Sequence, residues 1–142
     1  MTWIVDASVA VKWFVRESLH DEAMRLLDHI EPLQAPDLIV AEVTNIAWKK
    51  RIRGEIAHTQ AEAIATAIRQ YIPALHSSAE LNERALEIAL ALNHPVYDCL
   101  YIACAEKTDA ILITADEKLC ALAEKNGFGE LVRHLGDPST TL

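Results

Sequence analysis

Four carboxylates stand where an α/β fold places catalytic groups. Asp6 directly follows a short apolar segment of strand-like composition, and Asp116 follows another such segment by two residues. Glu42 and Asp98 lie near the starts of two segments with helical spacing. The carboxyl ends of parallel strands and the N-termini of the helices that follow them lie along one edge of a sheet. We therefore expect the four acids to meet at that edge.

Carboxylates that converge in this way repel one another. Two of them about 4 Å apart cost on the order of 4 kcal/mol at an effective dielectric constant of about 20. Proteins relieve such repulsion by protonating some of the acids or by binding a hard divalent cation. A set of oxygen donors favours Mg²⁺ or Mn²⁺ over zinc. The pattern therefore predicts a magnesium or manganese site held by Asp6, Glu42, Asp98 and Asp116.

A simpler interpretation exists for some of these acids. An aspartate that opens a helix is most often its N-cap, worth about 1 kcal/mol, and this interpretation suits Asp98 and Asp116. Asp6 is harder to explain as a cap alone, because Ser8 could serve that purpose. Glu42 lies too far inside its helix to cap it, and Asn45 and Lys49 follow it on the same helical face. Only the combination of the four acids favours a site.

Strand-like and helical segments alternate along the chain and must position these acids. Strands are expected at 3–5, 33–35, 72–76, 109–114 and 131–134, and helices at 7–15, 21–30, 37–53, 59–71, 78–92, from 96 onward and at 116–126. The alternation predicts an α/β fold with three α/β/α layers, in which a central, mostly parallel sheet of about five short strands carries helices on both faces. We expect one domain over 1–135 and a mobile C-terminal tail over 136–142.

Composition limits the classes of protein to which the chain can belong. Its 142 residues suffice for one domain with a full core. No apolar run approaches the ~20 residues of a membrane span, so we expect no membrane contact. The N-terminus lacks the pattern of a secretory signal, and the three cysteines form no CxxC pair, so reduced thiols in the cytoplasm are expected. The six histidines show no metal-ligand spacing and are expected in loops or on the surface.

The formal net charge of −8 argues against a protein that coats nucleic acid by bulk electrostatics. It is compatible with a nuclease, because acids can gather in a pocket while basic residues form a local patch. One basic patch consists of Lys49, Lys50, Arg51 and Arg53. A solvated helix end that the helix dipole stabilises explains this patch equally well.

Four sequence blocks stand in the order and spacing of the PIN-domain ribonucleases, a resemblance that runs from Trp3 to about Val132. The blocks are Ile4–Ser8, Ala41–Asn45, Tyr97–Ala103 and Leu112–Leu119. The chain is similar to the VapC-type toxins of toxin–antitoxin pairs. This resemblance implies a Mg²⁺- or Mn²⁺-dependent endoribonuclease, usually a homodimer, which a small cognate antitoxin silences.

The resemblance also implies roles for single residues. Asp6 and Asp98 resemble the principal metal-holding pair, which Glu42 and Asp116 complete, partly through metal-bound water. Hydroxyl and amide groups are implied in support: Ser8 and Thr114 would orient carboxylates or water, and Asn45 would hydrogen-bond within the site or touch substrate. Local backbone capping is an equally good explanation of the two hydroxyls. Unpaired RNA would enter over basic residues, namely Lys12, Arg16, Lys49, Lys50, Arg51 and Arg53.

Two other hypotheses fit a sheet edge rich in acids. A phosphoacceptor receiver domain normally carries adjacent acids after its first strand, whereas Asp6 is followed by Ala7. A catalytically silent PIN-like scaffold that acts only through partner binding would tolerate the loss of the four acids without a metal-binding phenotype.

Overall fold

A five-stranded parallel sheet forms the centre of the protein in a computed structural model that describes residues 1–140. The strands lie in the order β3-β2-β1-β4-β5, and every neighbouring pair is parallel. Their bounds are β1 Trp3–Val5, β2 Gln34–Pro36, β3 Ala74–His76, β4 Ile111–Thr114 and β5 Val132–His134. The expected number of strands and their parallel pairing are confirmed.

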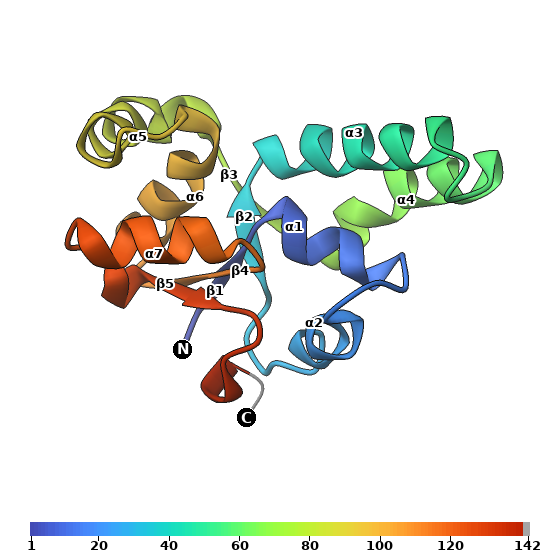
Figure 1. The fold of residues 1–142 in the computed structure, drawn as a ribbon, viewed down its shortest axis with the longest axis horizontal. Helices are drawn as coiled ribbons and strands as arrows, with labels where there is room; N and C mark the ends of the chain where they lie inside the picture. The colour runs from blue at the N-terminus through green and yellow to red at the C-terminus, as the bar shows by residue number, and fades with distance from the viewer. Residues whose placement is uncertain (141–142) are drawn as a thin grey trace.

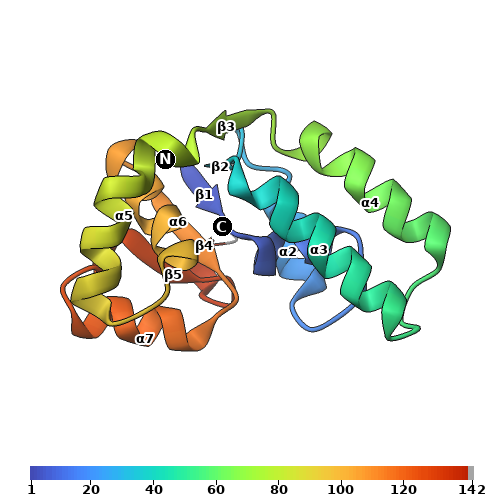
Figure 2. The same cartoon turned by 90° about the horizontal axis from the view of Figure 1, so that it is seen from above.

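Helices cover both faces of this sheet, as the three-layer prediction requires. The α-helices within residues 1–140 are α1 Ala7–Ala10, α2 His20–Leu26, α3 Leu38–Ile52, α4 His58–Tyr71, α5 Ser78–Leu92, α6 Val96–Lys107 and α7 Glu117–Lys125. Figures 1 and 2 show α1 to α4 gathered on one side of the strands and α5 to α7 on the other. The three-layer α/β/α fold is confirmed.

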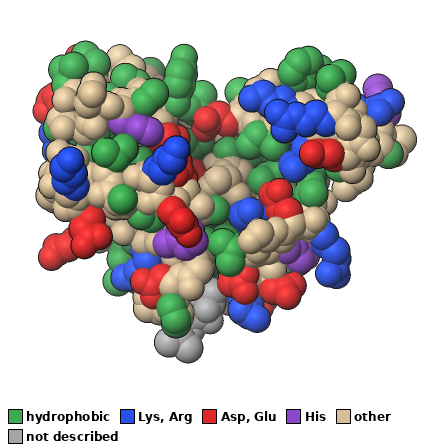
Figure 3. Space-filling view, in the orientation of Figure 1, with side chains coloured by type: hydrophobic (Ala, Val, Ile, Leu, Met, Phe, Trp, Pro, Cys, Tyr) green, Lys and Arg blue, Asp and Glu red, His purple; other side chains and the backbone are tan. Residues whose placement is uncertain are grey.

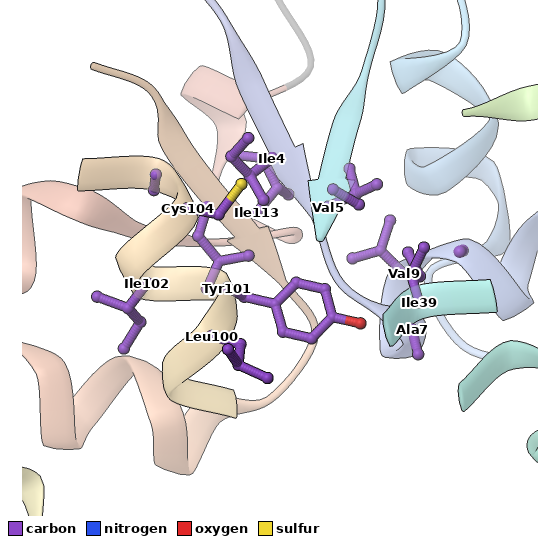
Figure 4. Packing of buried hydrophobic residues seen from close by; sticks show 14 of the residues in the cluster. Ile4, Val5, Ala7, Val9, Ile39, Leu100, Tyr101, Ile102, Cys104 and Ile113 are labelled. Atoms are coloured by element: carbon purple, nitrogen blue, oxygen red, sulfur yellow. The ribbon is translucent and has the colours of Figure 1, made fainter. Parts of the chain in front are cut away.

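The central strands are buried on both faces, which explains their continuous apolar composition. Ile4 and Val5 of β1 are completely buried, and they pair in register with Leu112 and Ile113 of β4. Figure 4 shows Ile4 and Ile113 packed beside side chains of α6. Each such side chain contributes about 1.5–3 kcal/mol when it is withdrawn from water. The ends of β1 and β4 are therefore held firmly in place.

The strands that follow β1 in the sequence are added first on one side of it and then on the other. The chain proceeds from β1 to β2 and β3 on one side, then crosses over to β4 and β5 on the other. In open α/β sheets, ligands bind outside the carboxyl ends of the strands at such a switch point. Asp6 follows the end of β1 and Asp116 follows the end of β4, so the topology alone brings these two acids to the expected position for a site.

Helix ends differ from the sequence expectation at two places. The second helix ends at Leu26 rather than at residue 30, and Ile30, the last residue of the expected helix, is 98% exposed. The apolar contact at this end is made instead by His29, whose ring stacks on Trp3 with centroids 4.0 Å apart. The fourth helix begins at His58, one residue before its expected start, and has no side-chain cap.

The first helix and the C-terminal segment are also less regular than expected. The helix expected over 7–15 consists of α1 followed by a 3₁₀ turn over Val11–Trp13. In the tail, Pro138–Thr140 forms another 3₁₀ turn, and the buried Thr140 donates a hydrogen bond to the His134 carbonyl at 3.2 Å. Residues 138–140 of the tail thus pack against the end of β5, and residues 141–142 lie outside the described residues.

Within residues 1–140, no single helix is both long enough and apolar enough to cross a membrane. Only α5 and α6 taken together meet the requirements of length and composition, and a bend of 115° separates them. The three cysteines carry free thiols, as expected.

Candidate active site

The four predicted acids converge on one small cavity at the carboxyl edge of the sheet. The cavity measures about 190 Å³ and is lined by Asp6, Ala7, Ser8, Glu42, Ile46, Asp98, Tyr101 and Asp116. Its walls come from α3 and α6 and from the segments that follow β1 and β4. Figure 3 shows a notch between the two lobes of the molecule with acidic side chains beside it. The fold thus brings together residues separated by more than one hundred positions.

Asp6 serves as a helix cap and also lines the cavity. Its Oδ1 accepts hydrogen bonds from the Ser8 hydroxyl at 2.6 Å and from the Val9 N–H at 3.2 Å, which caps α1. Its side chain is buried, and this burial raises its pKa from 3.8 to about 6. The hydrogen bond from Ser8 lowers the pKa, and the negative charge of Asp98 raises it. The hydrogen bonds that Asp6 accepts therefore do not fully offset the cost of burying its ionised form.

Two hydroxyls tie the ends of β1 and β4 together. Ser8 Oγ accepts from the Ala115 N–H at 3.0 Å and lies 3.5 Å from the Thr114 hydroxyl. The buried Thr114 hydroxyl accepts from the Asp116 N–H at 3.1 Å. Asp116 caps α7 by accepting two backbone N–H groups through its Oδ1. Ser8 and Thr114 therefore fix the backbone that carries the acids, although Thr114 does not itself line the cavity.

Glu42 is held from the opposite wall by Tyr101, a residue that the sequence reasoning missed. The hydroxyl of Tyr101 in α6 donates a short hydrogen bond to Glu42 Oε1 in α3. Figure 4 shows the Tyr101 ring projecting from α6 toward α1 and α3. Burial and the nearby Glu42 charge raise the pKa of Tyr101, so it remains a proton donor. Burial also raises the pKa of Glu42, the Tyr101 hydrogen bond opposes this, and the charges of Asp98 and Asp6 add to it.

Asp98 is hydrogen-bonded to His94, one of the histidines expected in loops or on the surface. His94 precedes α6, and its Nε2 donates a hydrogen bond to Asp98 Oδ2 at 2.6 Å. The two residues are four positions apart, a spacing that often brings side chains together on a helix. Pro95 at the N-cap position interrupts that pattern, and this is why the pair was not predicted.

The donors in the cavity suit a hard cation, although they do not form a closed cage. All four acids offer oxygen atoms, the ligands that Mg²⁺ and Mn²⁺ prefer. Within residues 1–140, no three His, Cys, Asp or Glu side chains stand close enough together to hold a metal ion by themselves. Mg²⁺ typically keeps several waters and uses one or two carboxylates, so it does not require such a cage. Burial is the main cause of the raised pKa values of Asp6 and Glu42, and a cation beside them would stabilise their ionised forms.

A larger hollow lies elsewhere and has a different character. It measures about 650 Å³ and lies beside α7 and β5. Its lining mixes the acids Glu124, Glu130 and Asp137 with Arg133 and His134, so opposite charges are interspersed there. The smaller carboxylate cavity is the better candidate, because its acids converge without a basic residue in the lining.

The six basic residues expected to bind RNA divide into two groups. Lys12 and Lys50 are partly buried and share Glu17, at 3.5 and 3.4 Å, and Lys50 also lies 3.5 Å from Glu55. Arg16 is exposed in a hollow that includes Glu17 and two further acids. The remaining three, Lys49, Arg51 and Arg53, are exposed and have no ion pair within residues 1–140.

Asn45 is exposed, does not line the cavity and has no side-chain hydrogen bond in the described part of the chain. Ile46, the next residue, occupies the corresponding part of the cavity wall. A role for Asn45 thus requires substrate to extend beyond the cavity.

Comparisons with known proteins agree on one family. Residues 3–125 match the family model described as PIN domain. The chain is 34% identical over 121 residues to Ribonuclease VapC3 of Pyrobaculum aerophilum, which covers 84% of this chain and 92% of that protein.

Two solved structures share the fold. PAE2754 from Pyrobaculum aerophilum superposes with a TM-score of 0.73 at 20% identity, over 95% of this chain and 91% of that one. VapC20 of Mycobacterium tuberculosis, described as a toxin that cleaves the sarcin–ricin loop, gives a TM-score of 0.67 at 22% identity, over 84% and 94% of the two chains.

Proposed function

This chain belongs to the PIN-domain family, and we propose that it is a metal-dependent endoribonuclease, the toxin of a toxin–antitoxin pair. The convergence of Asp6, Glu42, Asp98 and Asp116 on one cavity carries the proposal. The acids come from separate elements at the switch point of the sheet, where a packing role alone does not explain them. The similarity to Ribonuclease VapC3 supports RNA as the substrate.

In this proposal, Asp6 and Asp98 hold Mg²⁺, or Mn²⁺ in its place, while Glu42 and Asp116 complete the site, partly through water. The bound cation supplies positive charge against the scissile phosphate and lowers the pKa of a bound water. Ser8 and Thr114 keep the ends of β1 and β4 in register, which fixes the positions of the acids.

A carboxylate is also needed to orient the attacking water and accept its proton. We assign this role to Glu42, because it lines the cavity and burial raises its pKa, which makes it a stronger base than an exposed glutamate. The Tyr101 hydroxyl holds one Glu42 oxygen, so the direction of the carboxylate is fixed. Asn45, one turn further along α3, is proposed to contact substrate outside the cavity.

Partners follow from the same family membership. The substrate is proposed to be unpaired RNA, whose bases can be splayed out over the site. A small cognate antitoxin and a second copy of the chain are the proposed protein partners, and the cytoplasm is the proposed compartment. Exposed apolar side chains that such partners would cover include Trp48, which is 57% exposed, and Leu90, which is 74% exposed.

A catalytically silent scaffold is the competing function. One observation favours it: no three metal-binding side chains in the described chain form a ready-made cluster. A scaffold, however, does not explain why Asp6, Glu42, Asp98 and Asp116 all line one cavity. A receiver-like module is disfavoured because Ala7, rather than a second acid, follows Asp6.

Cleavage of an unpaired RNA by the purified protein, with Mg²⁺ or with EDTA, tests the proposal. We expect cleavage by the wild type with Mg²⁺ and none with EDTA. Asp6→Asn and Asp98→Asn should both be inactive yet folded, whereas Asp28→Asn, which changes an exposed acid outside the cavity, should retain activity. Cleavage retained in both cavity variants would overturn the assignment of the site.

A further inference from the structure

The exposed basic residues of α3 project from different faces of the helix. Lys49 follows Glu42 by seven residues, so it points within about 20° of Glu42 and lies about 10 Å further along the axis. Arg53 at the C-cap follows Glu42 by eleven residues and returns to the same face, about 16 Å along the axis. Arg51 follows by nine residues and points to the opposite side of the helix, about 180° away.

Two other basic residues, Lys50 and Lys12, already form ion pairs with acids of the protein. Lys50 points toward the packed side of α3, where its side chain is only 16% exposed and lies near Glu17 and Glu55. Lys12 is 11% exposed and shares the same Glu17. Their charges are compensated inside the protein. The charges of Lys49 and Arg53 are not compensated by any ion pair in residues 1–140.

We infer that Lys49 and Arg53 form a phosphate track, which holds the backbone of single-stranded RNA along the Glu42 face of α3. This inference rests on the proposed function and adds the path of the substrate to it. The track begins beside the carboxylate cavity, and Figure 3 shows Lys and Arg side chains gathered over the α3 and α4 lobe next to the notch. The chain as a whole carries a net charge of −8, so a polyanion must be guided by such a local row of cations.

Other features of the helix agree with this path. Exposed apolar residues border the track on one side: Ile52 projects about 60° and Trp48 about 100° from Lys49 around the axis of α3. Arg16, on the other side of Glu17, lies among Glu17, Asp21 and Glu22, whose negative charges oppose phosphate binding. The track therefore extends along α3 and not toward α2.

The helix dipole gives a competing explanation. Cations in the last turn of a helix are stabilised by its negative C-terminal end whatever face they occupy. Under that explanation Lys49, Arg51 and Arg53 are equivalent toward RNA. Under the phosphate track only two of them matter, and Arg51→Ala becomes a matched control with the same loss of charge on the same helix.

The test measures binding of a fluorescent single-stranded RNA of about 12 nucleotides to the cleavage-silent Asp98→Asn protein, by fluorescence anisotropy at several salt concentrations. Each phosphate contact contributes about 0.7 to the slope of log affinity against log salt for a single strand. We expect Lys49→Ala and Arg53→Ala each to lower the slope by about that amount and to weaken binding. Arg51→Ala should leave both quantities unchanged.

Equal losses in all three variants, or no loss in Lys49→Ala and Arg53→Ala, would overturn the phosphate track. So would failure of the Asp98→Asn protein to bind the RNA at all while the wild type cleaves it. In each of these cases Mg²⁺-dependent cleavage by the wild type would leave the proposed function standing. If Lys49→Ala and Arg53→Ala weakened the binding of a protein partner but not of RNA, this face of α3 would be assigned to that partner.

Discussion

Replacing Asp6 by asparagine is expected to stabilise the metal-free protein at neutral pH while abolishing the proposed reaction. Burial raises the pKa of Asp6 from 3.8 to about 6, so ionising this group is harder in the folded chain than in the unfolded one. Asparagine has nearly the same shape and keeps an oxygen that can accept the hydrogen bonds from Ser8 and the Val9 N–H. The cap of α1 is therefore retained, because asparagine caps helices as well as aspartate does.

The magnitude follows from the size of the pKa change. A rise from 3.8 to about 6 corresponds to about 3 kcal/mol of unfavourable ionisation in the folded state. A group whose pKa is raised on folding stabilises the protein while it is protonated. Its contribution is complete below about pH 4 and is lost as the pH rises through about 6. The gain from Asp6→Asn should accordingly reach about 3 kcal/mol near pH 7 and disappear near pH 4.

Urea unfolding in the presence of EDTA, at about pH 7 and about pH 4, measures this difference. Asp28→Asn, at an exposed position outside the cavity, is the control for the loss of a negative charge. With Mn²⁺ in place of EDTA, the wild type should gain stability by binding the ion and Asp6→Asn should gain less. A variant that is less stable than the wild type at neutral pH, or a stability difference independent of pH, would refute the reasoning about Asp6.

Three further substitutions test the contacts around the site. Tyr101→Phe removes the hydrogen bond to Glu42 and should weaken Mn²⁺ binding by about tenfold or more, as measured by calorimetry, with an unchanged circular dichroism spectrum. His94→Ala should weaken Mn²⁺ binding by a similar factor of about ten, because it frees the Asp98 carboxylate; unaltered binding would show that this contact does not position Asp98. Glu17→Gln leaves two partly buried lysines without their shared anion and should lower the free energy of unfolding by about 1–3 kcal/mol in urea.

The acids of the candidate site were predictable because each lies at a recognisable position along the chain. Asp6 and Asp116 follow apolar strands, and a parallel sheet places the ends of its strands at one edge. Glu42 has no capping role, which marked it as a functional candidate. The same logic predicted the three layers, because the central strands β1 and β4 are buried on both faces and read as continuous apolar segments.

The parts that were missed depend on contacts between distant residues. Tyr101 lies in a helix segment whose residues are all buried, so its composition hid a hydroxyl that reaches Glu42 in another helix. The ion pairs of Glu17 with Lys12 and Lys50 join the segment after α1 to α3, and no local pattern indicates them. Ile30 was misplaced because no glycine or proline marks the true end of α2 at Leu26.

Titration of the purified protein with Mn²⁺ in a calorimeter measures whether the four carboxylates hold a metal ion. We expect heat of binding for the wild type and its loss or strong reduction in Asp98→Asn, while Asp28→Asn binds as the wild type does. Absence of binding by the wild type, or equal binding by Asp98→Asn, would contradict a metal site built on the four carboxylates and would favour the catalytically silent scaffold.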